Sequence, residues 1–153
     1  MIDLLDVVND QIDRNIYHGA SIALFKDGKW SESYVGTIDG DNPVQPGMIY
    51  DLASVSKVVG VGTVVISLVR EGKLDIDMPL KHYYPEFHEN KLTLRQLLTH
   101  SSGINPFIPN RDSLNAEQLK DAINHITVED KKDFLYTDIN FLLLGFMLEK
   151  IFD

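Results

Sequence analysis

Residues 51–60 read DLASVSKVVG, in which Ser54 and Lys57 stand three positions apart ahead of a long apolar run. We expect a buried helix over residues 54–71, because the run is apolar almost all round, although its valines and two glycines are poor helix formers. A strand over Val58–Ile66 is the rival interpretation, and the length of the run and its glycines favour the helix. Side chains three apart on a helix share one face, with about 5 to 6 Å between their Cβ atoms. The pattern therefore brings an amine close to a hydroxyl.

A hydroxyl beside an amine can act as a nucleophile beside its base. A serine hydroxyl is weakly nucleophilic until a base removes its proton, and a lysine amine does this when burial or a nearby positive charge lowers its pKa. The positive end of the helix dipole would also favour the developing alkoxide. Taken alone, the spacing is weak support, because at average composition it arises by chance about once in a couple of hundred residues.

On the N-terminal side of this stretch the sequence predicts a helix and a β-hairpin. Apolar residues at spacings of three and four alternate with charged ones near the start, which is typical of an amphipathic helix. Asp27-Gly28 supplies the positive φ of a tight turn between two strand-like runs. The expected elements are a helix over residues 2–16, strands over residues 20–26 and 29–36, a loop over residues 37–47 and a short extended piece over residues 48–52.

On the C-terminal side the sequence predicts loops and further helices. Thr93 and Asn115 are N-cap candidates, and Gln118 follows Asn115 three residues later, as in a capping box. Either Thr137 or Asp138 would cap a last helix that carries apolar residues on one face. The expected elements are a loop over residues 73–92, helices from residue 93 to before residue 101 and over residues 115–125, and a helix from residue 137 or 138 to the last residue.

A hairpin with about five helices is an α+β composition. A two-stranded hairpin is only marginally stable unless more strands or a helix cover it. The sequence also stops inside a strongly apolar helix that has no closing cap. We therefore expect the front part of a longer domain with an incomplete sheet, or a chain that takes its missing strands from another chain.

The composition of the 153 residues argues against several classes of function. The formal charge is −9, which repels a phosphate backbone, so nucleic acid is not an expected partner. Cysteine is absent, which removes thiolate nucleophiles, and the histidines show no zinc-binding spacing, so no metal site is expected. The longest apolar run, Val58–Val69, is too short to span a membrane. The N-terminus lacks the pattern of a secretion signal, so a cytoplasmic location is expected.

Two further segments give the Ser-x-x-Lys spacing more weight. Residues 97–104 read LLTHSSGI, and residues 136–145 read YTDINFLLLG. Together with residues 51–60, in this order and spacing, they resemble the serine β-lactamase and penicillin-binding protein superfamily. The resemblance is to its class C-like, β-lactamase-related branch, in which a Tyr-x-Asn follows Ser-x-x-Lys. It covers the whole chain but only the front of the family's fold.

The resemblance implies a fold, a chemistry and a set of site residues. The fold is the N-terminal part of one β-lactamase/transpeptidase-like domain over residues 1–153, with a helix and hairpin up to residue 52 and a mostly helical part after it. Ser54 would be the acyl-accepting nucleophile, Lys57 its activating partner, and Tyr136 a phenol or phenolate that shares the proton transfers. The backbone N–H of Ser54 would form half of an oxyanion hole. The substrate would be a β-lactam, a D-amino-acid peptide or an ester, with no metal or organic cofactor.

The sequence departs from the family pattern at two points. Asp138 stands where the motif has a substrate-binding Asn, and its charge near Lys57 would hold the amine as ammonium, a worse base but a better electrostatic partner. The alternative is that Asp138 only caps the last helix. The Lys-Thr-Gly or His-x-Gly strand that lines the family's site is absent from the sequence, so we expect an incomplete site that is inactive or weak alone.

Three hypotheses remain open at this point. The first is the front portion of a serine hydrolase, and the second is a catalytically silent module of the same fold that binds a ligand without turnover. The third is a truncated chain that is stable only when it pairs with a complementing C-terminal segment or swaps elements with its twin in a homo-oligomer. His100, in the turn after a predicted helix, is expected to belong to the scaffold.

Overall fold

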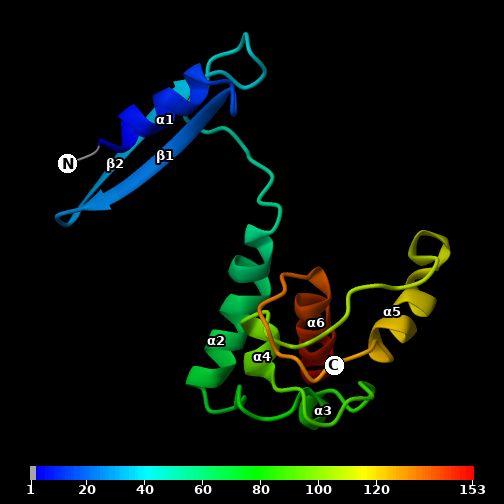
Figure 1. Ribbon diagram of the computed structural model, residues 1–153. Coiled ribbons are helices and arrows are strands. Elements are labelled where there is room, and N and C mark those ends of the chain that lie inside the picture. Colours follow the sequence, from blue (N-terminus) through cyan, green and yellow to red (C-terminus); the bar gives the residue numbers. More distant parts are fainter. Residues whose placement is uncertain (1–2) are drawn as a thin grey trace. The chain divides into compact units, whose positions relative to one another are not determined.

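A computed structural model describes residues 3–153, which form two compact units divided between Asp51 and Leu52 (Figure 1). The first unit holds a helix and a two-stranded hairpin, and the second is built of helices and irregular segments. The α+β composition predicted from the sequence is therefore confirmed. The first residue of the helix predicted over residues 2–16 lies outside the described residues.

Helix α1 (Leu4–Asp13) opens the N-terminal unit. The Asp3 carboxylate accepts a hydrogen bond of 3.0 Å from the Leu5 N–H, which satisfies one of the free donors of the first turn. The helix is followed by Asn15 in the left-handed region, at a φ of 55°, where a helix cannot continue. The prediction that the helix reaches Ile16 is wrong, and that side chain is exposed.

Strands β1 (Gly19–Lys26) and β2 (Lys29–Gly36) form the predicted hairpin and pair antiparallel along their whole length. Asp27 and Gly28, which join them, both have positive φ, at 51° and 75°. A two-residue turn of type I′ needs positive φ at both positions, so the predicted turn is confirmed. The predicted loop over residues 37–47 is also present.

The helix predicted over residues 54–71 is present, and the strand alternative is wrong. One turn of π-helix, η1 (Lys57–Gly62), leads directly into the α-helix α2 (Thr63–Arg70). The backbone of this segment thus adopts the helix that the length of the run favours, in spite of its valines and glycines.

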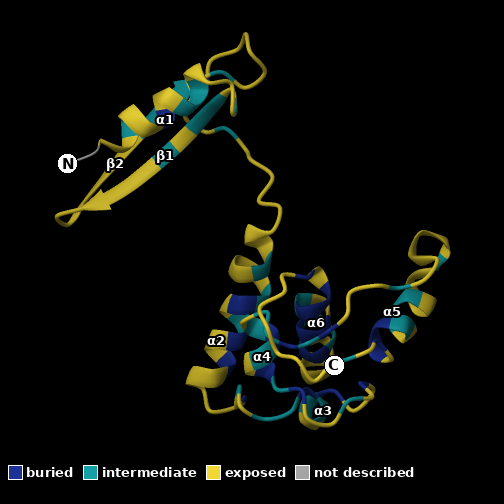
Figure 2. Ribbon diagram, viewed as in Figure 1, coloured by how far each residue is buried: buried dark blue, intermediate teal, exposed yellow. Residues whose placement is uncertain are grey.

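The expectation that this helix is buried all round is wrong (Figure 2). Val65 and Leu68 are buried against the other helices of the second unit. On the opposite side, no element of residues 52–153 covers the helix, so its apolar side chains meet solvent there. The exposed fractions are 63% for Val58, 57% for Val59 and 60% for Ile66.

Residues 73–92, predicted to be a loop, contain the short helix α3 (Leu80–Tyr83). Pro79 directly precedes it, and the fixed φ of proline, here −59°, suits the start of a helix. The prediction missed this element because a single turn shows too little periodicity to be recognised in sequence.

Three further helices begin where the sequence predicts. The first two open with capping boxes, Thr93 with Gln96 and Asn115 with Gln118, in which each side chain bonds the backbone N–H of the other residue. The Thr137 hydroxyl caps the last helix by accepting a backbone N–H. These helices are α4 (Leu94–Leu98), α5 (Ala116–Asn124) and α6 (Asp138–Phe152).

The core of the helical unit gathers around α6, which contacts η1, α3, α4 and α5. Each fully buried aliphatic or aromatic side chain contributes about 1.5–3 kcal/mol, so the burial of this cluster stabilises the packing of α6 against its neighbours. The largest fully buried apolar side chains are Val65, Leu80, Phe87, Leu92, Leu94, Leu97, Ile104, Ile123, Leu143, Leu144 and Met147.

Within residues 3–153, no helix combines the length and the hydropathy needed to cross a membrane.

Candidate active site

Ser54 lies in the turn that starts the long helix of the second unit. The residue before it, Ala53, has a left-handed φ of 43°, a conformation that costs an L residue about 1–2 kcal/mol. This turn brings the chain from an irregular segment into the helix and leaves the Ser54 side chain near the helix start. The Lys57 Nζ donates a hydrogen bond of 2.9 Å to the Ser54 Oγ. The hydroxyl and the amine are therefore in direct contact, as the spacing predicts.

Tyr136 reaches this pair from the segment that precedes α6. The Lys57 Nζ lies 5.1 Å from the centroid of its ring. Hydrogen bonds to the Ser54 hydroxyl and then to the Lys57 ammonium lower the pKa of the Tyr136 phenol from its ordinary value of 10.0. Tyr136 is 51% exposed, so the phenol is open to solvent on one side.

Asp138 is the first residue of α6, and Thr137 occupies the cap position before it. The alternative that Asp138 caps the helix is therefore wrong. Its Oδ1 lies 2.6 Å from the Lys57 Nζ. This bond, followed by the bond to Tyr136, raises the pKa of the Lys57 ammonium from its ordinary value of 10.5. The amine is held in its charged form.

Ser54, Lys57 and Asp138 line an open hollow of about 510 Å³ within the helical unit, and Tyr136 is not among its lining residues. The Lys57 side chain is only 16% exposed, whereas that of Asp138 is 73% exposed. The amine is therefore mostly buried, and the carboxylate is open to solvent. Among the residues that line the hollow, these two carry the formal charges, and they neutralise each other. The lining residues are Ala53, Ser54, Ser56, Lys57, Val61, Asp138, Phe141 and Leu142.

His100 packs against the ring of Tyr136. The two ring centroids are 4.5 Å apart, and the His100 Nδ1 lies 2.9 Å from the Nδ2 of Asn140. Sequence reasoning assigned His100 to the scaffold and overlooked Asn140, which is fully buried. A lone amide among the apolar residues of the last helix was the available signal, because a buried polar group needs a partner.

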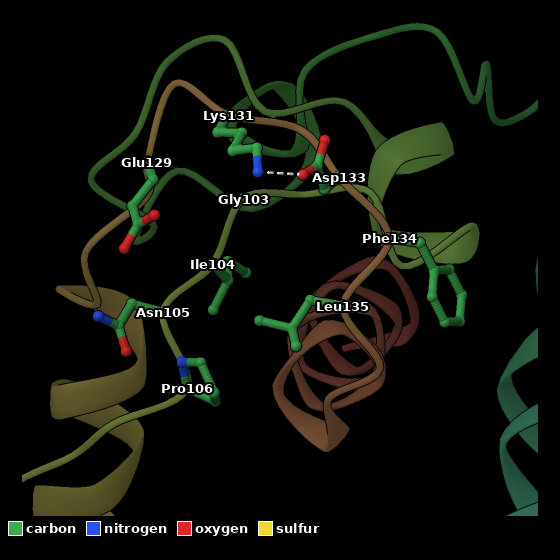
Figure 3. Close-up of a pocket in the computed structure, with 9 residues that line it drawn as sticks. All are labelled: Gly103, Ile104, Asn105, Pro106, Glu129, Lys131, Asp133, Phe134 and Leu135. Atoms are coloured by element: carbon green, nitrogen blue, oxygen red, sulfur yellow. Dashed lines mark ion pairs between the residues drawn. The ribbon is translucent and has the colours of Figure 1, made fainter.

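A second hollow, of about 370 Å³, lies beside the loop that leads into α6 (Figure 3). Lys131 and Asp133 form an ion pair at its edge, and Leu135 points towards Ile104 while Phe134 points away. Its lining contains no serine or tyrosine, so it has no counterpart of the hydroxyl, amine and phenol group. Across residues 3–153, no three His, Asp or Glu side chains cluster closely enough to hold a metal ion.

The sequence matches the model of one protein family, described as Beta-lactamase, over residues 6–153. This chain belongs to the Beta-lactamase family. The match extends over nearly the whole chain and includes all three motif segments. The resemblance predicted from those motifs is thus confirmed.

Similar curated members of the Beta-lactamase family include bacterial proteins and a mammalian mitochondrial protein. Protein flp of Staphylococcus aureus (strain NCTC 8325 / PS 47) is 27% identical over 95% of this chain and 32% of its own length. The mitochondrial serine beta-lactamase-like protein LACTB of Mus musculus is 31% identical over 81% of this chain and 24% of its own length. Teichoic acid D-alanine hydrolase of Staphylococcus aureus is 26% identical over 94% of this chain and 37% of its own length. The chain thus spans 24% to 37% of the length of these relatives.

Solved structures of similar fold agree with this assignment. A class C beta-lactamase superposes with a TM-score of 0.77 at 24% identity, over 95% of this chain and 43% of that one. The D-amino acid amidase of Ochrobactrum anthropi SV3, solved with D-phenylalanine, superposes with a TM-score of 0.74 at 23% identity, over 96% of this chain and 44% of that one. The fold is that of part of a class C beta-lactamase.

Proposed function

We propose that this chain is the front portion of a serine hydrolase that forms an acyl-enzyme on Ser54 with an amide or ester substrate. The observation that carries the proposal is the 2.9 Å bond between the Lys57 Nζ and the Ser54 Oγ, with the Tyr136 phenol bonded to both. Relatives named as a teichoic acid D-alanine hydrolase and a D-amino acid amidase support it. The substrate classes are β-lactams, D-amino-acid peptides and esters.

Acylation begins when the Tyr136 phenolate takes the proton of the Ser54 hydroxyl while the Oγ attacks the substrate carbonyl carbon. Lys57, held as ammonium, stabilises the phenolate instead of acting as the base. The carbonyl electron pair moves to oxygen, and the start of the helix offers partial positive charge to that oxyanion. When the oxyanion collapses, the bond to the leaving nitrogen or oxygen breaks, and Tyr136 gives its proton to the leaving group.

Deacylation repeats the same proton transfers with water. The regenerated Tyr136 phenolate takes a proton from a water molecule, whose oxygen attacks the Ser54 ester. The tetrahedral intermediate then expels the Ser54 Oγ, which recovers its proton from Tyr136, and a carboxylic acid is released. In this proposal Asp138, which lines the hollow, contacts the substrate.

Covalent labelling tests the proposal. The chain is incubated with a fluorophosphonate and with a fluorescent penicillin, and the adduct is mapped by mass spectrometry. We expect an adduct on Ser54 that is lost in Ser54→Ala. Ser67→Ala is the matched control, because Ser67 is an exposed serine on the same helix and lies outside the hollow. An adduct that persists in Ser54→Ala, or appears elsewhere, contradicts the proposal.

The second candidate function is a silent module that binds a ligand without turnover. The 2.6 Å ion pair between Lys57 and Asp138 favours it, because an amine held as ammonium leaves the proton transfers to the Tyr136 phenol alone. Saturable binding of penicillin, measured by calorimetry, without any adduct on Ser54 would support this function over the hydrolase.

We also propose that the open face of the long helix is covered by further polypeptide of a β-lactamase-like domain. The chain covers 43% of the class C beta-lactamase structure, so relatives carry a larger remainder that can pack here. The face forms an apolar groove of about 390 Å³. Its lining residues are Val58, Gly62, Val65, Ile66, Val69, Arg70, Ile76, Leu98 and Phe141.

A further inference from the structure

We propose that His100 is a positioning residue for Tyr136: its neutral imidazole, fixed through Nδ1, holds the phenol ring beside Lys57. The inference rests on the proposed function in one respect, the role of Tyr136 in proton transfer. It concerns a residue that lies outside the hollow and carries none of the reacting atoms. Three sets of contacts support it.

The first set is ring packing. The His100 and Tyr136 rings lie 4.5 Å apart between centroids, with 37° between their planes. Phe141 and Phe134 pack on His100 at 5.4 Å and 6.0 Å. His100 thus contacts three aromatic rings, and this packing restricts the position of the Tyr136 ring.

The second set consists of hydrogen bonds from His100 to the backbone of the residues before and after Tyr136. The Leu135 N–H donates a hydrogen bond of 2.8 Å to the His100 carbonyl oxygen. The Thr137 N–H donates to the His100 Nδ1 at 3.4 Å. His100 itself has a left-handed φ of 53°, which turns its carbonyl and its ring towards the same segment. One residue therefore holds the neighbours of Tyr136 in the chain as well as its ring.

The third set fixes the tautomer of the imidazole. A backbone N–H can only donate, so the bond from Thr137 requires an unprotonated Nδ1. The side chain of Asn140 also points its amide nitrogen at Nδ1, at 2.9 Å. With the amide in this orientation, its Oδ1 accepts from the Ser102 Oγ at 2.7 Å, and the same Oγ accepts the Ile104 N–H at 3.2 Å. The proton of the neutral ring therefore sits on Nε2.

The charges around His100 favour the same neutral form. Burial and then the Lys57 ammonium lower the pKa of the imidazole from its ordinary value of 6.5, and the Asp138 carboxylate acts in the opposite direction. A protonated ring would lose both bonds at Nδ1 and place a second cation near Lys57. The imidazole therefore stays in the state that holds the Tyr136 segment.

Two substitutions separate the acceptor from the ring. His100→Asn keeps an acceptor oxygen near the position of Nδ1 and tolerates the left-handed φ, but it lacks the ring. His100→Phe keeps a ring and lacks the acceptor. His82→Asn is the matched control, because His82 is an exposed histidine packed edge-on against another tyrosine, Tyr83, at 4.7 Å.

The measured quantity is the pKa of the Tyr136 phenol, which should not change if His100 only stabilises the fold. It is measured by NMR on ring-labelled tyrosine, with Tyr136→Phe to assign the signal. In His100→Asn we expect a folded chain by circular dichroism, a phenol pKa that rises towards 10.0, and labelling of Ser54 by fluorophosphonate slowed about 10- to 100-fold. His82→Asn should change neither quantity. We expect His100→Phe to shift the same pKa in the same direction, because the segment loses its Nδ1 acceptor.

An unchanged Tyr136 pKa in folded His100→Asn overturns the proposal, as does a parent chain whose His100 carries its proton on Nδ1 by nitrogen NMR. The nitrogen spectrum needs no variant, so the proposal can fail even where a substitution prevents folding. A raised Tyr136 pKa in a chain whose Ser54 is never labelled supports the positioning role and contradicts the hydrolase. If Ser54 is labelled but the Tyr136 pKa is unchanged in folded His100→Asn, the hydrolase is supported and the positioning role is contradicted.

Discussion

The Lys57 Nζ lies 2.6 Å from the Asp138 Oδ1, so the start of one helix is tied to the start of another that follows much later in the chain. An amide at position 138 would accept from the amine without adding charge, whereas the carboxylate stabilises the ammonium. The pKa of Lys57 is raised and that of Tyr136 is lowered. In the proposed reaction the proton-accepting role therefore falls to Tyr136.

Asp138→Asn should increase the rate at which Ser54 is acylated. The Asp138 carboxylate raises the pKa of Lys57, and its charge also raises that of Tyr136. Without it the Tyr136 phenol loses its proton at lower pH, so more of the phenolate that acts as the base is present at neutral pH. The rate of fluorophosphonate labelling, followed by mass spectrometry, should rise several-fold.

Asp77→Asn is the control for this change. Asp77 is an exposed carboxylate in the same unit that pairs with Arg95, so its loss removes an ion pair away from Ser54. Labelling should stay at the parental rate. An Asp138→Asn variant that labels no faster than Asp77→Asn would show that the carboxylate does not restrain the proton transfers.

The rate of labelling should follow a bell-shaped dependence on pH. Tyr136 must lose its proton to act as a base, and its pKa is lowered from 10.0, so the rate rises with pH through a midpoint below that value. Lys57 must keep its proton to stabilise the phenolate, and its pKa is raised from 10.5, so the rate falls only above that value. Labelling across the neutral to alkaline range measures both limbs.

Tyr136→Phe should remove the rising limb, because no phenol is left to ionise. If the rising limb persists in this variant with the same midpoint, another group is the base. The chain offers a matched control in Tyr34→Phe, which removes a phenol bonded to Glu32 in the other compact unit.

Local chemistry made the hairpin and the helix starts predictable. Asp27-Gly28 needs only its own two residues to form a type I′ turn, and Thr93 with Gln96 needs only a few neighbours to form a capping box. The same holds for Ser54 and Lys57, whose contact follows from the spacing of a helix. Interactions between residues close in sequence are readable because the backbone geometry that joins them is nearly fixed.

Long-range relationships were not readable in the same way. The contact between His100 and Asn140 joins residues 40 apart, and no periodic pattern of one sequence pairs them. Burial of the helix after Ser54 was predicted wrongly for a related reason, since Val58 and Val59 are apolar but a side chain is buried only if another segment covers it. The sequence pattern shows that a residue is apolar, but whether its side chain is buried depends on the segment that packs against it.

The charge of the probe should matter at this site. The ion pair of Lys57 with Asp138 leaves the hollow with almost no net charge, so an anionic penicillin gains little attraction there. We expect Asp138→Asn, which leaves the ammonium unpaired, to speed labelling by penicillin more than labelling by a neutral fluorophosphonate. The ratio of the two rates checks this, and an unchanged ratio would mean that Asp138 has no part in selecting the substrate.

The open apolar face should make the isolated chain bind a hydrophobic dye and associate as its concentration rises. Val59→Lys, at a side chain that is 57% exposed, should reduce both effects while changing the free energy of unfolding by no more than about 0.5 kcal/mol. Light scattering after size exclusion measures the mass. A discrete dimer that buries this face would mean that a second copy covers it, and a monomer that binds no dye would mean that the face is closed.

Asn140 should be the most sensitive polar residue of the helical unit. It is fully buried, its Oδ1 accepts from the Ser102 Oγ at 2.7 Å, and its Nδ2 lies 2.9 Å from the His100 Nδ1. Asn140→Ala leaves the Ser102 hydroxyl without its acceptor, and an unsatisfied buried group costs about 1–3 kcal/mol.

Urea denaturation of Asn140→Ala, Ser102→Ala and the double variant completes a double-mutant cycle. Because the two side chains share one bond, the double variant should lose less free energy of unfolding than the sum of the single losses, by about 0.5–3 kcal/mol. Asn90→Ala, at an exposed asparagine, should change that free energy by no more than about 0.5 kcal/mol. Additive losses would show that Ser102 and Asn140 stabilise the unit independently. The hydrogen bond between them would then contribute no coupling energy, and it would not help to orient Asn140 towards His100.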